Sequence, residues 1–418
     1  MTWEVVEGVF NLRFSPVFTA AIAAMVFALG LWLRKKFAFL RFFCVPPGVA
    51  GGLFMAFVAF FLYAPKVVSV HYDLTLQNSM IAVFFTRIGM AGSFRLFSRG
   101  RKILIVYLLC CWGLALFQNV LGVFLANLLG IHPVLGVMAG AVSLEGGHNL
   151  AVVFGPMAEA LGVSGAQAVA VAAATFGLMV GGTVGAPVAD WLVKHRRLPI
   201  ETSDDASYKG YHDYFLDENI DINVNAFVQA LGLLLALMAL GAWGAEWIEA
   251  GIRRRWGHEN FVFPGYMGAM FLALVFRNVN DVCKLVRIHP KSMDLIAAVS
   301  VSLFLTTSMM SLKIWELYGL AAPLLLILVA QFVAVVLIAV FVLFPLMGRD
   351  YDAAIICAGF VGHGLGAPPS AVSMMRAACD QHNLISYKAF LIVPLCGAVL
   401  IDIVALPNII WFINHFSR

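Results

Sequence analysis

Glu145-Gly146-Gly147-His148-Asn149-Leu150 is a polar, glycine-rich stretch that interrupts apolar sequence. A second such stretch begins 217 residues later and reads Gly362-His363-Gly364-Leu365-Gly366-Ala367-Pro368-Pro369-Ser370. Irregular backbone that faces lipid leaves N–H and C=O groups unpaired, so it is tolerated only inside protein or beside a water-filled site. Both stretches are therefore predicted to lie inside a membrane protein.

The composition also indicates a membrane protein whose main partner is the lipid bilayer. Of 418 residues, 62% are hydrophobic and 12% are charged, whereas soluble proteins are about 25% charged. The sequence shows no nucleophile–base pair, no cofactor fingerprint, no metal cluster and no basic patch for nucleic acid. We therefore expect neither an enzyme nor an organic cofactor nor a nucleic-acid partner.

Ten apolar segments are near the roughly 20 residues that a bilayer-spanning helix requires, apart from a few that are shorter or longer. They are residues 14–33, 47–64, 79–94, 103–129, 166–192, 223–249, 262–280, 293–311, 318–346 and 386–414. Two further segments, 133–160 and 352–380, each consist of short apolar arms around a glycine-rich tip, which predicts a re-entrant hairpin. The predicted fold class is an all-α polytopic membrane protein with about ten transmembrane helices and two re-entrant hairpins.

The two halves of the chain are similar to each other. Residues 47–53 align with 264–270 at an offset of 217, and residues 85–90 align with 305–310 at an offset of 220. Successive spans place these halves in opposite directions, which predicts inverted repeats around a site at mid-membrane depth, as in alternating-access transporters. The predicted parts are a first span (1–45), a first repeat (46–192), a linker (193–222), a connecting span (223–261) and a second repeat (262–418).

Loop charges predict the orientation. Seventeen Lys and Arg residues flank the spans on one side and seven on the other, and the richer side faces the cytoplasm. Both termini are therefore expected outside the cell membrane, and the linker 193–222 inside.

The hairpin tips are the predicted substrate site. Glycine lets the backbone bend and approach a ligand, whereas Pro368 and Pro369 each remove an N–H donor and exclude a continuous helix. His148 and His363 occupy similar places in the two motifs, where they line the site, form structural hydrogen bonds or relay protons. The predicted substrate-binding residues are Arg87, Glu145, Gly146, Gly147, His148, Asn149, Gly364, Gly366, Ala367, Pro368, Pro369 and Ser370.

Arg87 and Glu145 are charges within predicted membrane segments, where each costs roughly 2.5–3.5 kcal/mol. One interpretation is that they pair with each other. In the alternatives, Arg87 binds a substrate carboxylate by a bidentate fork, or Glu145 holds a cation or a proton.

Oxygen-bearing side chains in other spans suggest a sodium site. Hard cations take oxygen ligands, and the residues considered for sodium are Thr306, Thr307, Gln118, Asn119 and Asp402. Hydroxyls in a span also bond to their own helix, and bonding between helices equally explains Gln118 and Asn119, so both interpretations stay open.

The chain resembles the bacterial sodium/glutamate symporters from about Pro46 to the last span. The residues that carry the resemblance are Pro47–Leu53, Gln118-Asn119, Gly146-Gly147-His148, Ala174–Leu178, Gly364–Ala367, Phe390–Pro394 and Ile401–Val404. The resemblance implies a homodimeric, elevator-type secondary transporter of the bacterial inner membrane that is driven by sodium and carries glutamate. In that mechanism the hairpins and spans 293–311 and 386–414 form the mobile unit, and the other spans form the dimer scaffold.

The tips depart from the usual pattern of that family. Glu145 replaces a serine, Asn149-Leu150 replace Gly-Thr, and Arg87 replaces a threonine. Ala367-Pro368-Pro369-Ser370 stands where Ala-Thr-Pro-Thr is usual. The same fold with proton coupling, or with a substrate other than glutamate, is therefore an alternative. A channel or a transport-dead sensor is a further one.

Overall fold

The computed structural model describes residues 2–6, 9–42, 45–63, 68–92, 101–200, 224–256, 263–313 and 319–417. Of the predicted linker, only residues 193–200 belong to this described part. The chain divides into two compact units, one comprising Met1–Ser93 with Ile222–Tyr318 and the other Phe94–Asp221 with Gly319–Arg418. Each unit thus combines a piece from each half of the sequence.

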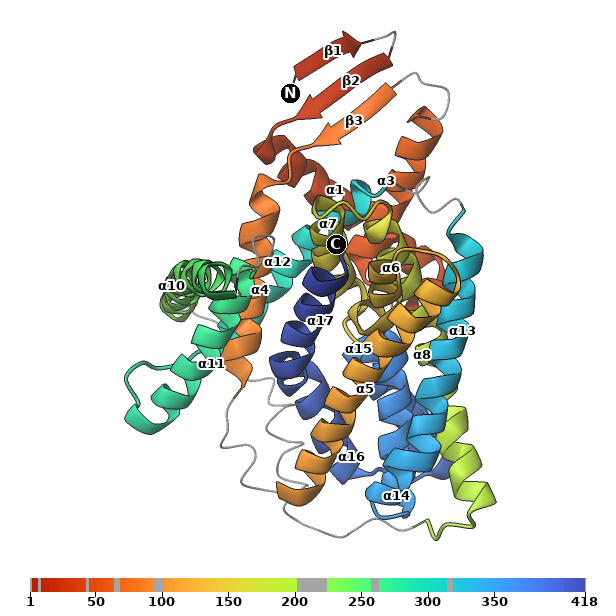
Figure 1. The fold of residues 1–418 in the computed structure, drawn as a ribbon. Helices are drawn as coiled ribbons and strands as arrows, with labels where there is room; N and C mark the ends of the chain where they lie inside the picture. The colour runs from red at the N-terminus through yellow and green to blue at the C-terminus, as the bar shows by residue number, and fades with distance from the viewer. Residues whose placement is uncertain are drawn as a thin grey trace. The chain divides into compact units, whose positions relative to one another are not determined.

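The first unit contains a small β-sheet and seven helices among its described residues (Figure 1). The elements are β1 (Thr2–Val6), β2 (Val9–Phe14), α1 (Pro16–Lys36), α2 (Ala38–Phe42), α3 (Pro47–Tyr63), β3 (Val68–Tyr72), α4 (Thr75–Ala91), α10 (Val224–Trp256), α11 (Gly265–Cys283) and α12 (Pro290–Met310). Proline opens three of the helices, because a missing N–H has no cost at the first helical position.

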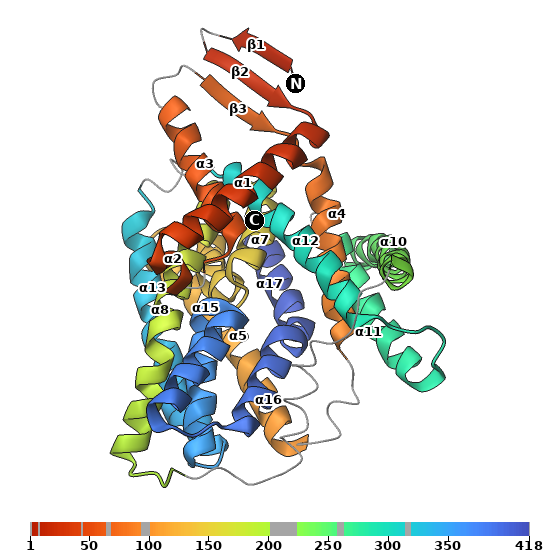
Figure 2. The same ribbon diagram turned by 180° about the vertical axis from the view of Figure 1, so that it is seen from behind.

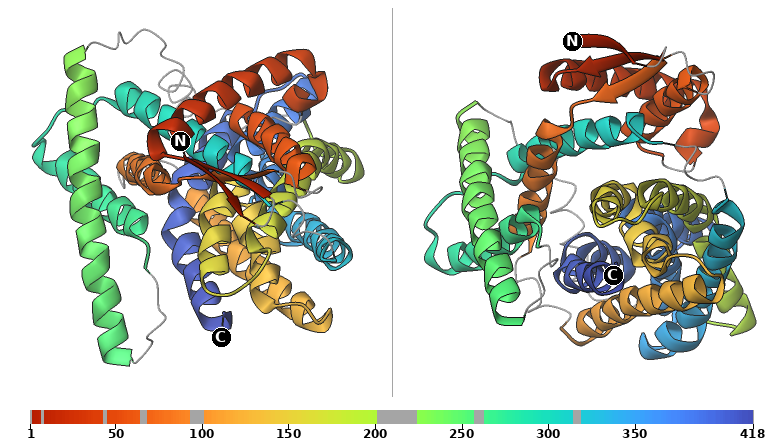
Figure 3. Two further views of the ribbon diagram at one scale, coloured as in Figure 1. Left: turned by 90° about the horizontal axis from the view of Figure 1, so that it is seen from above. Right: turned by 45° about the horizontal axis from the view of Figure 1, so that its top comes forward.

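Glycine sets how closely the helices of this unit approach. A Cβ on Gly51 of α3 would collide with the carbonyl oxygen of Val26 in α1, and one on Gly268 of α11 would collide with the carbonyl oxygen of Gly241 in α10. Figure 2 shows α1 against α3, and the left view of Figure 3 shows α10 as the long green helix beside α11. Small residues at these positions thus allow the helices to pack closely.

Besides its helices, the first unit contains a three-stranded sheet of β1, β2 and β3, which the apolar pattern did not predict. β1 pairs antiparallel with β2, and β2 pairs parallel with β3. In the register, Phe14 lies opposite Tyr72, and their rings stack with centroids 5.8 Å apart. Apolar and polar residues alternate in β2 and β3, as is typical of strands. These strands have only six and five residues, so they are much shorter than the apolar runs that identify membrane spans.

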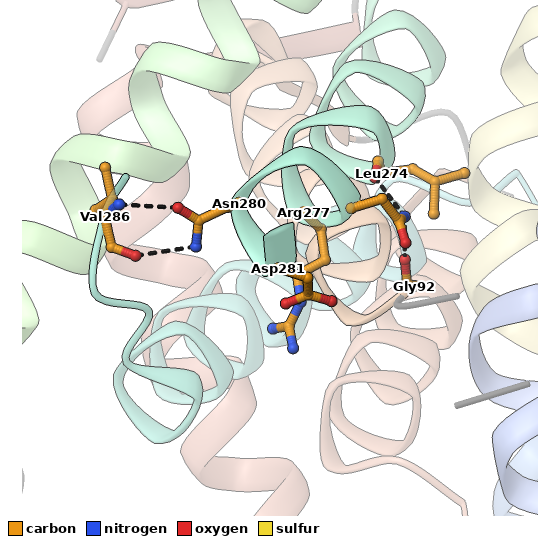
Figure 4. A network of polar contacts seen from close by, with 7 residues as sticks. Gly92, Leu274, Arg277, Asn280, Asp281 and Val286 are labelled. Carbon is orange, nitrogen blue, oxygen red and sulfur yellow. Dashed lines mark hydrogen bonds and ion pairs between the residues drawn. The ribbon is translucent and has the colours of Figure 1, made fainter. Parts of the chain in front are cut away.

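Side-chain amides organise the end of α11 (Figure 4). The side chain of Asn280 accepts a hydrogen bond from the backbone N–H of Val286 at 2.8 Å and donates one to its carbonyl at 2.9 Å. Asn278 donates to the carbonyl oxygen of Gly92, beyond the end of α4, at 2.8 Å. These bonds fix the turn between α11 and α12 and connect α11 to α4.

All regular secondary structure in the described residues of the second unit is helical. Its elements are α5 (Arg101–Leu128), α6 (Pro133–Val137), η2 (Met138–Val142), α7 (Gly147–Ala160), α8 (Ala166–His195), α13 (Ala321–Ile338), η4 (Ala339–Leu343), α14 (Phe344–Leu346), α15 (Tyr351–His382), α16 (Tyr387–Leu395), η5 (Cys396–Leu400) and α17 (Asp402–Phe416), where η denotes a π-helical turn. Figure 2 shows α15 beside α8.

The first polar stretch is a break between two helical arms. Gly140 leaves helical geometry with φ −103° and ψ −135°. Glu145 and Gly146 form a turn, and α7 begins at Gly147, whose φ of +59° lies in the left-handed region that glycine tolerates. The predicted interruption at this motif is confirmed.

The second polar stretch lies where α15 doubles back on itself. A Cβ on Gly362 would lie 2.9 Å from the Cα of Ala371, whereas nine residues of straight helix advance about 14 Å. In addition, Gly185 of α8 contacts both Ala358 and Met374. The chain therefore reverses between residues 362 and 371, within the segment in which a hairpin was predicted.

Each of the ten predicted spans coincides with a helix or with a run of consecutive helical elements. In the part of the chain that the structure describes, six helices are long and apolar enough to cross a membrane. They are Pro16–Lys36, Lys102–Leu128, Ala166–His195, Val224–Arg255, Pro290–Met310 and Ala321–Leu346. The total of ten spans stays a prediction.

Candidate functional site

The two polar stretches meet at one helix of the second unit. A Cβ on Gly177 of α8 would collide with the carbonyl oxygen of Leu365 and would lie 2.8 Å from Cδ2 of Leu144. One turn further along α8, a Cβ on Gly181 would lie 2.8 Å from the backbone nitrogen of Gly366. The absence of side chains at Gly177 and Gly181 thus lets both tips approach the same face of α8.

Two adjacent amides of α5 contact both broken segments. The Nε2 of Gln118 donates to the carbonyl oxygen of Gly364 at 2.7 Å. The Oδ1 of Asn119 accepts from the backbone N–H of Ala141 in η2 at 3.2 Å, and its Nδ2 donates to Oδ1 of Asn408 in α17 at 3.2 Å. The predicted bonding between helices by Gln118 and Asn119 is confirmed.

A third amide extends this network to α13. The Nε2 of Gln331 donates to the backbone carbonyl of Gln118 at 2.7 Å. Each glutamine is oriented by its own Nε2 bond, and each Oε1 is buried without a hydrogen-bond donor in the described part of the chain. Buried carbonyl oxygens in this state are suited to accept a hydrogen bond from a ligand or to coordinate a cation.

Glu145 is the buried acid of the first tip. Only 5% of its surface is exposed, and among the described residues neither carboxylate oxygen has a hydrogen-bond partner. Glu145 is therefore a buried carboxyl group that no hydrogen bond from the described residues compensates.

The two histidines differ in their surroundings. The Nε2 of His148 lies 3.0 Å from Oγ1 of Thr175, which donates its only hydrogen to the carbonyl oxygen of Val171. His148 is therefore the donor, and its Nε2 carries a proton. His363 is 1% exposed, and neither of its ring nitrogens has a hydrogen-bond partner in the described part of the chain. Its ring lies against Gly397 of η5.

The other predicted tip residues are placed as follows. Gly146 and Asn149 are partly exposed. Ser370 is buried and donates through Oγ to the carbonyl oxygen of Gly366 at 2.8 Å. The side chains at positions 367–369 lie outside the described residues.

Arg87 belongs to the first unit, where its charge is compensated. Its guanidinium lies 2.6 Å from the carboxylate of Asp294 on α12, and the side chains are 18% and 58% exposed, respectively. This ion pair replaces the one considered with Glu145. A role of Arg87 in binding substrate stays a prediction.

The residues considered for sodium are divided between the units. Gln118, Asn119 and Asp402 belong to the second unit, and the two threonines belong to the first. Thr306 donates to the carbonyl oxygen of its own helix at 2.7 Å, and Thr307 does so at 2.8 Å. The hydroxyl hydrogens thus bond within α12, as one of the two interpretations expected.

Sequence reasoning did not assign a role in the site to Gly177, Thr175, Gln331 or Asn408. The last two are amides in apolar helices, which is a usable signal because a buried amide requires partners. Gly177 gives no such signal, since its role depends on which carbonyl packs against it.

Apolar helices of membrane length, with two polar interruptions that meet inside one unit, define a helical multi-pass membrane protein with the architecture of a transporter. The chain belongs to the sodium/glutamate symporter family, whose pattern matches residues 12–384. It is 34% identical to the sodium/glutamate symporter of Escherichia coli K12 over 387 residues, which cover 92% of this chain and 94% of the relative. It is 32% identical to the one of Haemophilus influenzae over 399 residues, or 94% and 96% of the two chains.

Proposed function

We propose that this protein is a secondary active transporter that couples the uptake of glutamate, or of a related small anionic solute, to sodium. Family membership supports the substrate and the coupling ion. The observation that carries the proposal is the meeting of both polar tips at Gly177. Beside it, Asn119 bonds to the first broken segment and Gln118 to the second. A site built from discontinuous helices is typical of secondary transporters.

In this proposal the two broken segments are re-entrant hairpins, and their tips bind the substrate. α7 begins at Gly147 and His148 without a side-chain cap, and a helix N-terminus favours an anionic group. The proposed substrate-binding residues in the second unit are Glu145, Gly146, Gly147, His148, Asn149, Gly364, Gly366, Ala367, Pro368, Pro369 and Ser370.

Alternating access then requires one unit to move against the other. Both hairpins and span 386–414 belong to the second unit, which we propose as the mobile unit. Span 293–311 was expected to move with them, but its helix α12 belongs to the first unit. We propose that the first unit is the scaffold of an elevator-type homodimer in the bacterial inner membrane.

Contacts within the first unit support the predicted repeat. Gly52 of α3 packs on Met309 of α12, and Gly89 of α4 packs on the backbone of Met270 in α11. Under the two sequence offsets that relate the halves, the contact of Gly52 with Met309 corresponds to a contact of Ala269 with Gly89. The observed contact of Gly89 with Met270 differs from it by one residue. Inverted repeats supply the two equivalent states that alternating access needs.

Coupling to sodium gives the energy for accumulation. One positive charge that enters down the membrane potential releases about 2.3 kcal/mol per 100 mV. The test is uptake of labelled glutamate into proteoliposomes with an imposed sodium gradient. Accumulation that depends on the gradient is expected, and accumulation that ignores it would exclude sodium coupling.

One observation favours a second candidate, the same fold coupled to protons. Glu145 is a buried carboxyl group without a hydrogen-bond partner in the described part of the chain, and such a group also binds a proton. Uptake driven by a pH jump in sodium-free buffer would identify this alternative. A counterflow experiment distinguishes both candidates from a channel, because solute on the opposite side of the membrane does not stimulate uptake through a channel.

A further inference from the structure

The imidazole of His363 is buried at the reversal of α15 without a hydrogen-bond partner. The residue is 1% exposed, and neither Nδ1 nor Nε2 is bonded in the described part of the chain. A neutral imidazole has one N–H donor and one bare nitrogen that accepts. Because a buried polar group that stays unpaired is destabilising, we expect this ring to meet a partner that the folded chain does not supply.

The position of this ring is fixed from two directions. A Cβ on Gly397 of η5 would lie 3.2 Å from Nδ1 of His363 and 3.3 Å from its Cε1, so the ring packs directly on glycine backbone. The next residue along the chain, Gly364, is held to α5 by the hydrogen bond from Gln118 at 2.7 Å. A side chain that is anchored in this way loses little conformational freedom when it binds a ligand.

Four other buried polar side chains of the site use their donor groups within the protein. The Nε2–H of His148 donates to the hydroxyl of Thr175, and the hydroxyl of Ser370 donates to a backbone carbonyl of the second tip. The side-chain nitrogens of Gln118 and Gln331 also donate to backbone carbonyls. The ring of His363 differs from these groups, because neither of its nitrogens is engaged in the described part of the chain.

The negative charge of the proposed solute requires donors, which distinguishes His363 from the other unpaired groups. An ionised carboxylate only accepts hydrogen bonds. The unpaired oxygens of Gln118 and Gln331 are themselves acceptors, so they do not bond to such a group. The ring N–H of His363 is a donor, and its bond to a carboxylate is charge-assisted and therefore stronger than a neutral one.

We propose that His363 donates a hydrogen bond from its ring to a carboxylate of the transported solute. This inference rests on the proposed function and adds to the second tip a substrate-binding residue that recognises the anionic group. The second ring nitrogen stays an acceptor, as the neutral imidazole requires.

The test measures solute binding by the purified full-length protein, with isothermal titration of L-glutamate in sodium-containing buffer. H363F keeps an aromatic ring but removes both nitrogens. We expect its Kd to rise about tenfold or more, which is typical for the loss of a hydrogen bond to a charged group. The matched control is H415F, which makes the same exchange at an exposed histidine of α17 that stacks on Trp411. It should bind like the wild type.

Two conservative variants separate a hydrogen bond to the solute from a structural role. H363N places an amide N–H near the position of Nδ1, and H363Q places one near the position of Nε2. One of them should recover most of the lost affinity, and which one does so identifies the donating nitrogen.

Thermal melting in ligand-free buffer adds a second signature. H363F replaces unpaired polar atoms by apolar ones, so it should melt at or above the wild-type temperature. The loss of a structural contact would lower that temperature. If H363F does not yield folded protein, H363L carries the same expectations for binding and melting.

Two results would overturn the proposal while L-glutamate still binds to the wild type. Unchanged binding in H363F would show that internal water satisfies the ring. Equal losses of affinity in H363F, H363N and H363Q would show that His363 acts only on the structure.

A failure of the proposed function gives a different result, in which the wild type does not bind L-glutamate at all. The same titrations with succinate then test His363 on another carboxylate solute. A wild type that binds neither acid, or an H363F variant that binds succinate as well as the wild type does, would overturn this inference too.

Discussion

The side-chain amide of Gln118 donates a hydrogen bond of 2.7 Å to the backbone carbonyl of Gly364 and so attaches the reversal of α15 to α5. The backbone carbonyl of the same Gln118 accepts from Gln331 of α13 at 2.7 Å. Three elements of the second unit are thereby joined through one residue, and substitutions there are expected to act on the second tip.

Replacement of Gln118 by leucine leaves the carbonyl of Gly364 unpaired inside the unit. We expect a loss of about 1–2 kcal/mol in stability, the upper range for polar bonds between membrane helices, together with a strong loss of uptake. Thermal melting and proteoliposome uptake measure the two effects. The matched control is Gln381→Leu, at an exposed position; equal damage from both variants would show that the bond to Gly364 is unimportant.

A methyl group on Gly177 tests whether the two tips must approach α8 closely. In Gly177→Ala the new Cβ would collide with the carbonyl oxygen of Leu365, and overpacking of this kind typically costs about 1–3 kcal/mol. Gly113→Ala is the control, because a Cβ there meets nothing within 4 Å. It is expected to be neutral or to stabilise α5 by up to about 1 kcal/mol. Wild-type melting and uptake in Gly177→Ala would contradict the packing argument.

Arg87 and Asp294 are expected to behave as a structural ion pair. Because the carboxylate side is 58% exposed, removal of either charge should cost only about 0.2–1 kcal/mol. Exchange of the two charges, in Arg87→Asp with Asp294→Arg, should restore most of the loss in thermal melts. If the exchange restores stability but the KM for glutamate stays raised, Arg87 also contacts the substrate.

Asp73 should make stability depend on pH outside the membrane segments. Hydrogen bonds from the side chain and then the backbone N–H of Thr75 hold the pKa of the Asp73 carboxyl below its ordinary value, against a smaller opposing effect of burial. A folded-state pKa below the unfolded one stabilises the protein above the unfolded value, and this contribution is lost as the pH falls through the folded one.

The measurement for Asp73 compares melting temperatures of the wild type and Asp73→Ala at several pH values. The difference should be present at pH 7 and should shrink below about pH 4, where an ordinary aspartate becomes protonated. Thr75→Val removes the hydroxyl donor but keeps the backbone donor, so it should show a part of the effect. A difference that grows on acidification would refute this account.

The sequence predicts the helices well, because an apolar run of about 20 residues has few alternatives to a helix in a membrane. It also locates both interruptions, since glycine and proline mark them directly. The sheet escaped prediction because Phe10 pairs with Val68, and no local pattern shows a pairing across 58 residues. In addition, β3, which pairs in parallel with β2, is only five residues long.

The contacts of the candidate site residues could be predicted only in part. Gln118 and Asn119 stood out as amides in an apolar helix, and their bonds to two broken segments follow from that chemistry. The partner of Arg87 lies 207 residues away, and the meeting of the tips depends on which carbonyl reaches Gly177. Such relations are set by tertiary packing and have no signature in the local sequence.

The β-sheet constrains on which side of the membrane two residues lie, and this constraint does not depend on the loop charges. Phe14 and Tyr72 are paired neighbours on parallel strands, and each strand leads within three residues into a helix, α1 or α4. Both helices therefore begin at the same end of the sheet. A membrane-impermeant reagent that reaches residue 14 should reach residue 72 from the same side, so the two strands form a built-in marker of sidedness.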